Sequence, residues 1–330
     1  MQIKLAIIAI AIVIPLSSFA VTQTNYNSEI SSNVYSKLQV VTSANFLYEF
    51  TQTIGNEIID VSLLVPMGVD PHDWEPTIRD TERLQRANMI IINGIGYEHW
   101  IDSLDTSGYQ GIIVDTSDGI LIDDEKHDDE KHDDEKHDDE KHDDEKHDDE
   151  KHDDEKHDDE KHGNLDPHIW LNPVYAQLQV KNIANALSNS DPENKKYYQS
   201  NAEIYITELD SLDSKIRNDL SNCRTDFITF HNAFSYFSKE YGLTQHTIIS
   251  SNDSHGEVTP KTLENIISLA KELNIKVIFA EESTSIKTSQ VIADEIGGKV
   301  LVLSPLEITS TSNYISKMNQ NLENLQEALC

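Results

Sequence analysis

The chain has 330 residues, which is enough for two ordinary domains, and its formal net charge is −33 at pH 7. Eight tandem Asp-Asp-Glu-Lys-His repeats at residues 123–162 carry −16 of that charge, and the remaining −17 still makes an acidic protein. This balance argues against a nucleic-acid-binding protein and against binding to an anionic membrane surface, because both functions need basic surfaces.

The first 20 residues have the pattern of a secretory signal peptide. Lys4 supplies the positive charge, residues 5–15 form the apolar core, and Ser18-Phe19-Ala20 has the small-x-small form of a cleavage site. An uncleaved N-terminal anchor is the alternative, since the apolar stretch approaches the length of a short membrane span. Either way we expect the protein outside the cytoplasm, in the periplasm, at the cell surface or secreted. Residues 21–35 are polar and predict a flexible tether.

Strand and helix patterns alternate over residues 36–190, which predicts an α/β lobe with a mainly parallel sheet. The predicted strands are Leu38–Thr42, Ile58–Val65, Met89–Asn93 and Gly111–Asp115, and the predicted helices are Ala44–Ile54, Thr77–Ala87 and Val174–Leu187. The second strand ends in a turn that contains Asp70-Pro71-His72. His72 would then lie beyond the carboxyl end of a strand, where open α/β sheets bind their ligands.

The repeat run at residues 123–162 is predicted to be a disordered insertion in this lobe. It has no apolar residue from which a core could form, and five residues of helix would not bring successive repeats onto one face. Its histidines are candidate weak metal ligands: His127, His132, His137, His142, His147, His152, His157 and His162. The alternative is a solvated acidic linker that keeps the protein soluble.

Apolar residues spaced three or four apart between Tyr198 and Leu220 predict one long helix, residues 191–222, that begins at Asp191-Pro192. A helix of this length, roughly 45 Å, would be a stiff connection between two lobes. Residues 223–330 repeat the alternation of strand and helix. Predicted strands are Asp226–Phe230, Leu243–Ile249, Lys276–Ala280 and Lys299–Leu303, and predicted helices are Ala233–Tyr241, Pro260–Leu273, Ile286–Ile296 and Asn313–Ala328.

Potential metal ligands follow strands or sit in rigid turns in both halves. Asp166-Pro167-His168 forms such a turn, because Pro167 fixes its own φ and restricts the residue before it. His231 follows the first strand of the second half, Glu281 follows the third, and Glu307 lies after the fourth. Imidazole and carboxylate ligands suit a divalent transition metal, and three histidines with one carboxylate are typical of zinc. We interpret the other histidines of the folded halves, His99, His246 and His255, as structural.

Two cysteines, Cys223 and Cys330, lie in the second half of the chain. Export from the cytoplasm permits a disulfide between them, and two unpaired thiols are the alternative.

Five stretches, taken together, resemble the metal-binding cluster of ABC-transporter solute-binding proteins of the zinc and manganese uptake type. They occur in family order over roughly residues 37–330, and the acidic, His-rich insertion before the second stretch is similar to the zinc-specific branch. The stretches are Gly68-Val-Asp-Pro-His-Asp-Trp-Glu-Pro-Thr77, Asp166-Pro-His-Ile-Trp-Leu-Asn-Pro173, Phe230-His-Asn-Ala-Phe-Ser-Tyr-Phe237, Phe279-Ala-Glu-Glu282 and Leu303-Ser-Pro-Leu-Glu307.

The resemblance implies two α/β lobes, each with a mainly parallel four-stranded sheet, joined by one long rigid helix. It implies a metal in the cleft between the lobes, held by His72, His168 and His231. The fourth ligand would be Glu307, with Glu281 or water as the alternatives. Manganese-type members tend to have Glu at the third matched position, so His231 favours zinc. No lipid-accepting cysteine follows the apolar core, unlike in the lipoprotein members.

The predicted function is therefore capture of Zn²⁺ outside the cytoplasm and its delivery to an ABC-transporter permease, by a monomer that is not an enzyme. Manganese or iron in the same transporter class is the first alternative. A non-transporting metal buffer or adhesin is the second. A zinc hydrolase would need an open coordination position and a nearby general base, and the chain has no His-Glu-x-x-His run.

Overall fold

The computed structural model describes residues 37–66, 68–69, 71, 74–106, 108–121, 165–249, 258–281, 286–308 and 312–330. Several predictions fall outside these residues and are not tested by the structure. They are the signal peptide, the tether, the repeat run with its eight histidines, His72 and His255.

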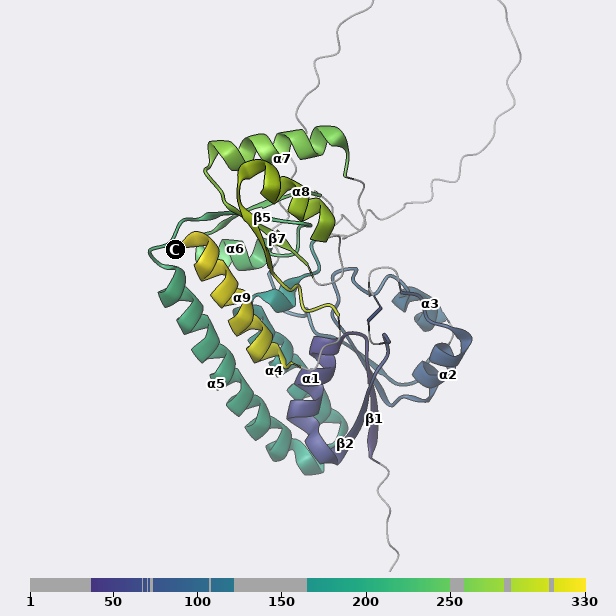
Figure 1. Ribbon diagram of the computed structural model, residues 1–330. Helices are drawn as coiled ribbons and strands as arrows, with labels where there is room; N and C mark the ends of the chain where they lie inside the picture. Colours follow the sequence, from purple (N-terminus) through teal and green to yellow (C-terminus); the bar gives the residue numbers. More distant parts are fainter. Residues whose placement is uncertain are drawn as a thin grey trace, which may run out of the picture. The chain divides into compact units, whose positions relative to one another are not determined.

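The first lobe is built on a parallel four-stranded sheet in the order β2-β1-β3-β4. Figure 1 shows β1 and β2 of this sheet side by side. The strands are β1 (Leu38–Thr42), β2 (Ile59–Leu63), β3 (Met89–Ile92) and β4 (Ile112–Asp115). Alternate residues of the central strands point to opposite faces. Met89 and Ile91 pack with helix α1 (Asn45–Gly55), whereas Ile90 and Ile92 pack with α2 (Ile78–Arg86) and α3 (Ile101–Thr106). Both faces of the sheet are therefore covered.

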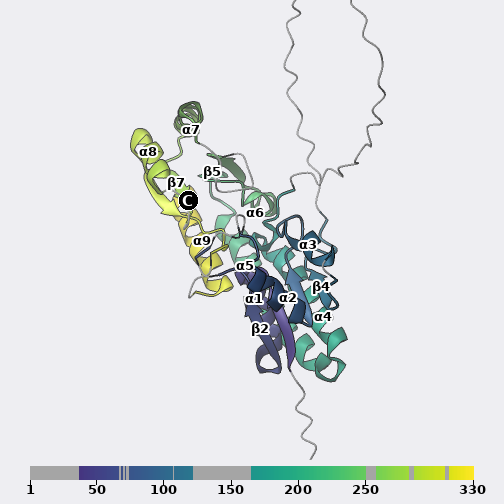
Figure 2. The same cartoon turned by 90° about the vertical axis from the view of Figure 1, so that its right-hand side faces the viewer.

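The second lobe repeats this plan with the sheet order β6-β5-β7-β8, again parallel. Its strands are β5 (Asp226–Thr229), β6 (Thr244–Thr247), β7 (Val277–Ala280) and β8 (Lys299–Val302). Its helices are α6 (Ser235–Tyr241), α7 (Pro260–Glu272), α8 (Ile286–Ile296) and α9 (Tyr314–Leu329). Ile228 and Ile278 pack with α7 and α8 on one face. Figure 2 shows these two helices beside β5 and β7. Phe227 and Phe279 belong instead to the core that α9 shares with the first lobe.

Two long helices, α4 (Pro173–Ser190) and α5 (Lys195–Leu220), connect the lobes. Figure 1 shows α5 running beside α4 and α9, and it also contacts α1. Its buried face is the set that the sequence predicted: Tyr198, Ala202, Tyr205, Leu209, Leu212, Ile216 and Leu220. One hydrophobic core thus runs from the sheet of the first lobe, across α4 and α5, to α9 and the sheet of the second.

The predicted helix over residues 191–222 differs from the structure at its beginning. A separate 3₁₀ turn, η4 (Pro192–Asn194), precedes α5, which has 26 residues. Oδ2 of Asp191 accepts hydrogen bonds from the side-chain Nδ2 of Asn194 at 2.7 Å and from the Tyr198 hydroxyl at 2.7 Å. These bonds fix the tighter turn. The helix α3 was not predicted, because its six residues are too few to show an apolar period.

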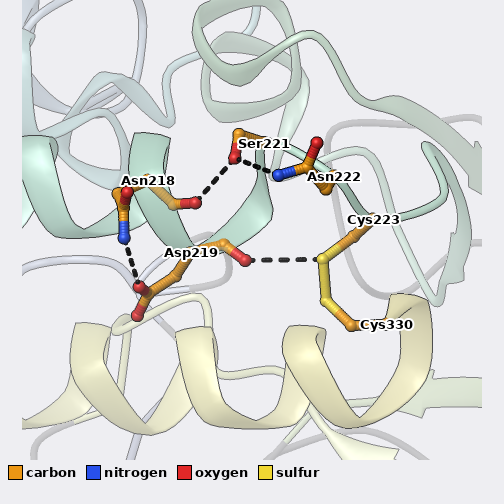
Figure 3. Close-up of a disulfide and its surroundings, with 6 residues drawn as sticks. All are labelled: Asn218, Asp219, Ser221, Asn222, Cys223 and Cys330. Carbon is orange, nitrogen blue, oxygen red and sulfur yellow. Dashed lines mark hydrogen bonds between the residues drawn. A yellow bond between two sulfur atoms is a disulfide. The ribbon is translucent and has the colours of Figure 1, made fainter.

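Cys223 and Cys330 form a disulfide, as predicted, which ties the chain just after α5 to the end of α9 (Figure 3). A backbone hydrogen bond from Arg224 N–H to the Leu329 carbonyl, at 3.0 Å, joins the same two segments. Among the described residues, no helix combines the length and apolar character that crossing a lipid bilayer requires.

Candidate metal centre

His168 is held by the turn that contains it. The side-chain oxygen Oδ1 of Asp166 accepts the His168 backbone N–H at 3.0 Å and lies 2.6 Å from ring atom Nδ1. A carboxylate at Nδ1 fixes the imidazole tautomer and leaves Nε2 available as a metal ligand. The 3₁₀ turn η3 (Ile169–Leu171) follows, and all three of its side chains are buried. The histidine itself is fully buried, so its orientation is set by packing as well as by Asp166.

His231 has the same arrangement in the second lobe. It follows β5, and its Nδ1 lies 2.6 Å from Oε1 of Glu281, which also accepts the His231 backbone N–H at 3.1 Å. Glu281 follows β7, the neighbour of β5 in the sheet, so the two residues meet at one sheet edge. Glu281 therefore lies behind His231, on Nδ1, and is not among the atoms grouped as possible metal ligands.

Glu307 comes from the loop between β8 and α9 and meets His168 across the lobes. Its Oε1 lies 2.9 Å from Nε2 of His168, and the Nε2 atoms of His168 and His231 are 3.3 Å apart. One ligand atom from each of the three residues lies within 4.8 Å of the others, and all three residues are buried. Donor atoms of a tetrahedral zinc ion would be about 3.3 Å apart, given zinc–nitrogen distances of about 2.0–2.1 Å. The spacing therefore suits one small cation.

The electrostatics of this cluster favour positive charge. Burial lowers the pKa of His168, but Asp166 and Glu307 act in the opposite sense through their charges and hydrogen bonds, and raise it to about 10. Three carboxylates, those of Asp166, Glu281 and Glu307, surround two imidazoles in a buried space. A divalent cation would balance much of that charge, whereas an anionic solute would be repelled.

The remaining sequence candidates lie elsewhere or outside the described residues. His72 and the repeat histidines are not described. His99 pairs with Glu75 at 2.9 Å on the surface, and His246 of the edge strand β6 pairs with Asp226 of β5 at 2.9 Å. A surface hollow of about 670 Å³ in the first lobe is lined by residues of β1, β2 and α2, and includes none of the three clustered side chains.

Sequence reasoning did not foresee the contacts of Asp166 and Glu281 with the two imidazoles, and it weighed Glu281 only as an alternative metal ligand. The two-residue spacing of Asp166 and His168 is a local signal that could have been read as a hydrogen-bonded turn. The contact between His231 and Glu281 depends on which strands are neighbours, and this order is not encoded in the alternation of strand and helix.

The chain matches the family model "Zinc-uptake complex component A periplasmic" over residues 40–328. It is 39% identical over 305 residues to the high-affinity zinc uptake system protein ZnuA of Bacillus subtilis, an alignment covering 89% of this chain and 88% of that protein. It is 34% identical over 301 residues to the zinc-binding protein AdcA of Streptococcus pyogenes, covering 88% of this chain but only 56% of AdcA. The chain thus spans about half the length of AdcA.

Solved structures show the same architecture. The metal-dependent lipoprotein YcdH of Bacillus subtilis superposes with a TM-score of 0.71 at 36% identity, covering 89% of this chain and 99% of that one. The Zn(II)-bound ZnuA-like domain of Streptococcus pneumoniae AdcA gives a TM-score of 0.70 at 28% identity, covering 88% and 98%. On the extent of the sequence match and the shared two-lobe fold, the chain belongs to the family of periplasmic zinc-uptake complex component A proteins.

Proposed function

We propose that this protein captures one Zn²⁺ ion between its two lobes, outside the cytoplasm, and delivers it to the permease of an ABC transporter. The observation that carries the proposal is the pair of buried imidazoles from different lobes, whose Nε2 atoms are 3.3 Å apart. Each imidazole has a carboxylate on its Nδ1, and Glu307 lies beside them. His72, outside the described residues, is proposed as the further ligand because its Asp-Pro-His sequence matches the one that contains His168.

The donor set supports zinc over manganese or iron, which stay the alternatives within this transporter class. Nitrogen ligands suit zinc, whereas manganese sites favour oxygen donors. Three histidines and Glu307 would make a closed tetrahedral set. Catalytic zinc needs an open position for water, so we infer that the bound ion is cargo and that the protein is not an enzyme.

We propose the following organisation for the parts that the structure does not describe. Residues 1–20 direct export, and residues 21–35 tether the first lobe. The run at residues 123–162 collects zinc weakly, because unperturbed histidines with pKa values near 6.5 are mostly neutral at pH 7 and able to bind metal. Deleting the run should leave one tight zinc site and remove several weaker ones. Calorimetry that gives the same zinc stoichiometry with and without the run would favour the alternative of a solubilising linker.

The test of the function has two parts. Protein purified without added metal should contain one zinc per chain after exchange against a chelator that strips weak sites, and manganese in that position would favour the alternative metal. Cells that lack this protein should then grow poorly when zinc is scarce. The wild-type gene should restore growth, and a folded His168→Ala/His231→Ala variant should not. A metal buffer or adhesin would bind zinc equally well, but its loss would leave zinc uptake unchanged.

A further inference from the structure

The loop that carries Glu307 has a backbone conformation that needs external support. Leu306, the residue before Glu307, has φ 61°, in the left-handed region that non-glycine residues rarely adopt. Its own lobe holds the beginning of the loop: Ser304 N–H donates to Asn321 Oδ1 at 2.8 Å, Asn321 Nδ2 donates to the Ser304 carbonyl at 2.7 Å, and Leu306 N–H donates to Ser304 Oγ at 3.3 Å. The orientation of Glu307 therefore depends both on these bonds and on contacts that Pro305 makes outside its own lobe.

The opposite lobe holds Pro305. Trp170, in the turn just after His168, donates its indole N–H to the Pro305 carbonyl at 2.8 Å. Tyr314, the first residue of α9, donates its hydroxyl to the Trp170 carbonyl at 2.6 Å. Trp170 is stacked on Phe46 of α1, with ring centroids 4.3 Å apart, so its position is fixed by the first lobe. Pro305 and the first residue of α9 thus both bind one residue of the first lobe, Trp170.

Glu49 of α1 makes the remaining link. Both of its carboxylate oxygens lie 2.8 Å from the backbone N–H of Tyr314, and Tyr205 donates its hydroxyl to Oε1 at 3.4 Å. This contact is not the side-chain cap of α9, because Asn313 supplies that cap by accepting the Ser316 N–H at 2.8 Å. A carboxylate at the amino end of α9 also interacts favourably with the helix dipole. Glu49 therefore binds the second lobe without being needed to start its helix.

We propose that Glu49 is a positioning residue for the metal site. It holds the first turn of α9 against α1, which seats Tyr314 and Pro305 on Trp170 and keeps Glu307 within reach of His168. The proposal rests on the proposed function, since it takes Glu307 to be a zinc ligand. Glu49 acts through the beginning of α9, whereas Asp166 and Glu281 contact the ligand histidines directly.

Loss of Glu49 should therefore act on zinc through Glu307 alone. We expect Glu49→Ala to weaken zinc binding about 10–100-fold, the range found for residues that orient metal ligands. Glu49→Gln keeps one oxygen that can accept the Tyr314 N–H, so it should restore much of the affinity. With Co²⁺ as the probe, the visible absorption should lose intensity in Glu49→Ala, because loss of the carboxylate opens the site to water and raises the coordination number of the ion above four.

Asn313→Ala is the matched control, since it removes the side-chain cap of the same helix and leaves the contact between lobes intact. Zinc titrations against a competing fluorescent chelator, with thermal unfolding of each variant, should show full affinity in Asn313→Ala and weakened affinity in Glu49→Ala. If Glu49→Ala does not fold, Glu49→Gln is compared with Asn313→Ala instead. Its loss of zinc affinity should be smaller than the range of about 10–100-fold but should exceed the experimental error of the affinity measured for Asn313→Ala.

The Glu307→Ala background separates this proposal from the proposed function. Wild-type protein that binds no zinc tightly would refute the function itself. If the function holds, Glu307→Ala should weaken binding, and adding Glu49→Ala should cause no further loss. Three results would each overturn the positioning role. The first is wild-type zinc affinity in both Glu49 variants, and the second is an equal loss of affinity in Asn313→Ala. The third is a Glu49→Ala effect that is as large in the Glu307→Ala background as in the wild type.

Discussion

The Nε2 atoms of His168 and His231 lie 3.3 Å apart although the two residues belong to different lobes. Neither lobe alone presents this pair, so the site exists only when the lobes are in their observed positions. The hydrophobic core that continues through α4, α5 and α9 sets those positions. The affinity for metal is thus coupled to the packing between the lobes.

Removing either imidazole should weaken zinc binding by more than about 100-fold, which exceeds the loss expected when a residue behind a ligand is removed. His168→Ala and His231→Ala are the variants, and competition against a chelator is the measurement. His246→Ala is the control, because His246 pairs with Asp226 away from the cluster. Wild-type affinity in His231→Ala would show that the assignment is wrong.

Changing the carboxylates that contact the Nδ1 atoms should lower zinc affinity less than removing an imidazole, but by a measurable amount. Asp166→Asn and Glu281→Gln keep an oxygen near Nδ1 but lose its charge, so zinc affinity should fall about 10–100-fold. Asp226→Asn is a matched control, because it alters the same kind of histidine–carboxylate pair at His246, outside the cluster. Equal effects from all three substitutions would mean that the losses reflect general destabilisation and not ligand orientation.

Much of the fold could be predicted because its signals are local. Every strand of the described residues was predicted, with ends that agree within two residues, since strand periodicity and turn residues are read from neighbouring positions. The strand order was not predicted, because it depends on contacts between residues far apart in sequence. The same distinction between local signals and long-range contacts applies to the residues of the site. His168, His231 and Glu307 follow strands or turns and could be nominated, whereas the contact of Glu281 with His231 needs the adjacency of β5 and β7.

The disulfide should stabilise the fold without affecting the metal site. Cys223 and Cys330 are 107 residues apart, and the loop-entropy model gives an upper estimate of about 4–5 kcal/mol for closing a loop of that size. Denaturant unfolding with and without reductant should show a loss of up to that amount. Zinc affinity of the reduced, folded protein should stay unchanged, since the disulfide lies at the opposite end of α9 from Tyr314. Unchanged stability on reduction would contradict the estimate.

The lobes should move little when metal binds. The helix α5 contains no glycine or proline that could act as a hinge, and its buried face is part of the core that both lobes share. Local rearrangement near the cleft is therefore expected in place of domain closure. Small-angle scattering on protein lacking residues 123–162 should give nearly the same radius of gyration with and without zinc. A decrease of several ångströms would contradict a rigid connection.

Glu98 should make the stability of the first lobe depend on pH. Its carboxylate is buried and accepts hydrogen bonds from Ser43 Oγ at 2.5 Å, Asn93 N–H at 2.8 Å and Gly94 N–H at 3.0 Å. Burial raises its pKa to about 7, although the three hydrogen bonds lower it. Asn93 in turn donates to the Pro167 carbonyl at 2.9 Å, beside the turn that holds His168. Glu98 is thus linked through Asn93 to the turn that holds His168.

Because the pKa of Glu98 is higher in the folded protein than its ordinary value of 4.5, the folded state binds this proton more tightly than the unfolded state does. The resulting stabilisation is fully present below about pH 4.5 and is lost as the pH rises through about 7. The free energy of unfolding should therefore fall between pH 5 and pH 8, on the order of 3 kcal/mol more in the wild type than in Glu98→Gln. Denaturant titrations at several pH values measure this, with the exposed Glu57→Gln as control. Parallel curves for wild type and Glu98→Gln would contradict a raised pKa, whatever their offset, because the offset also contains the loss of one hydrogen-bond acceptor.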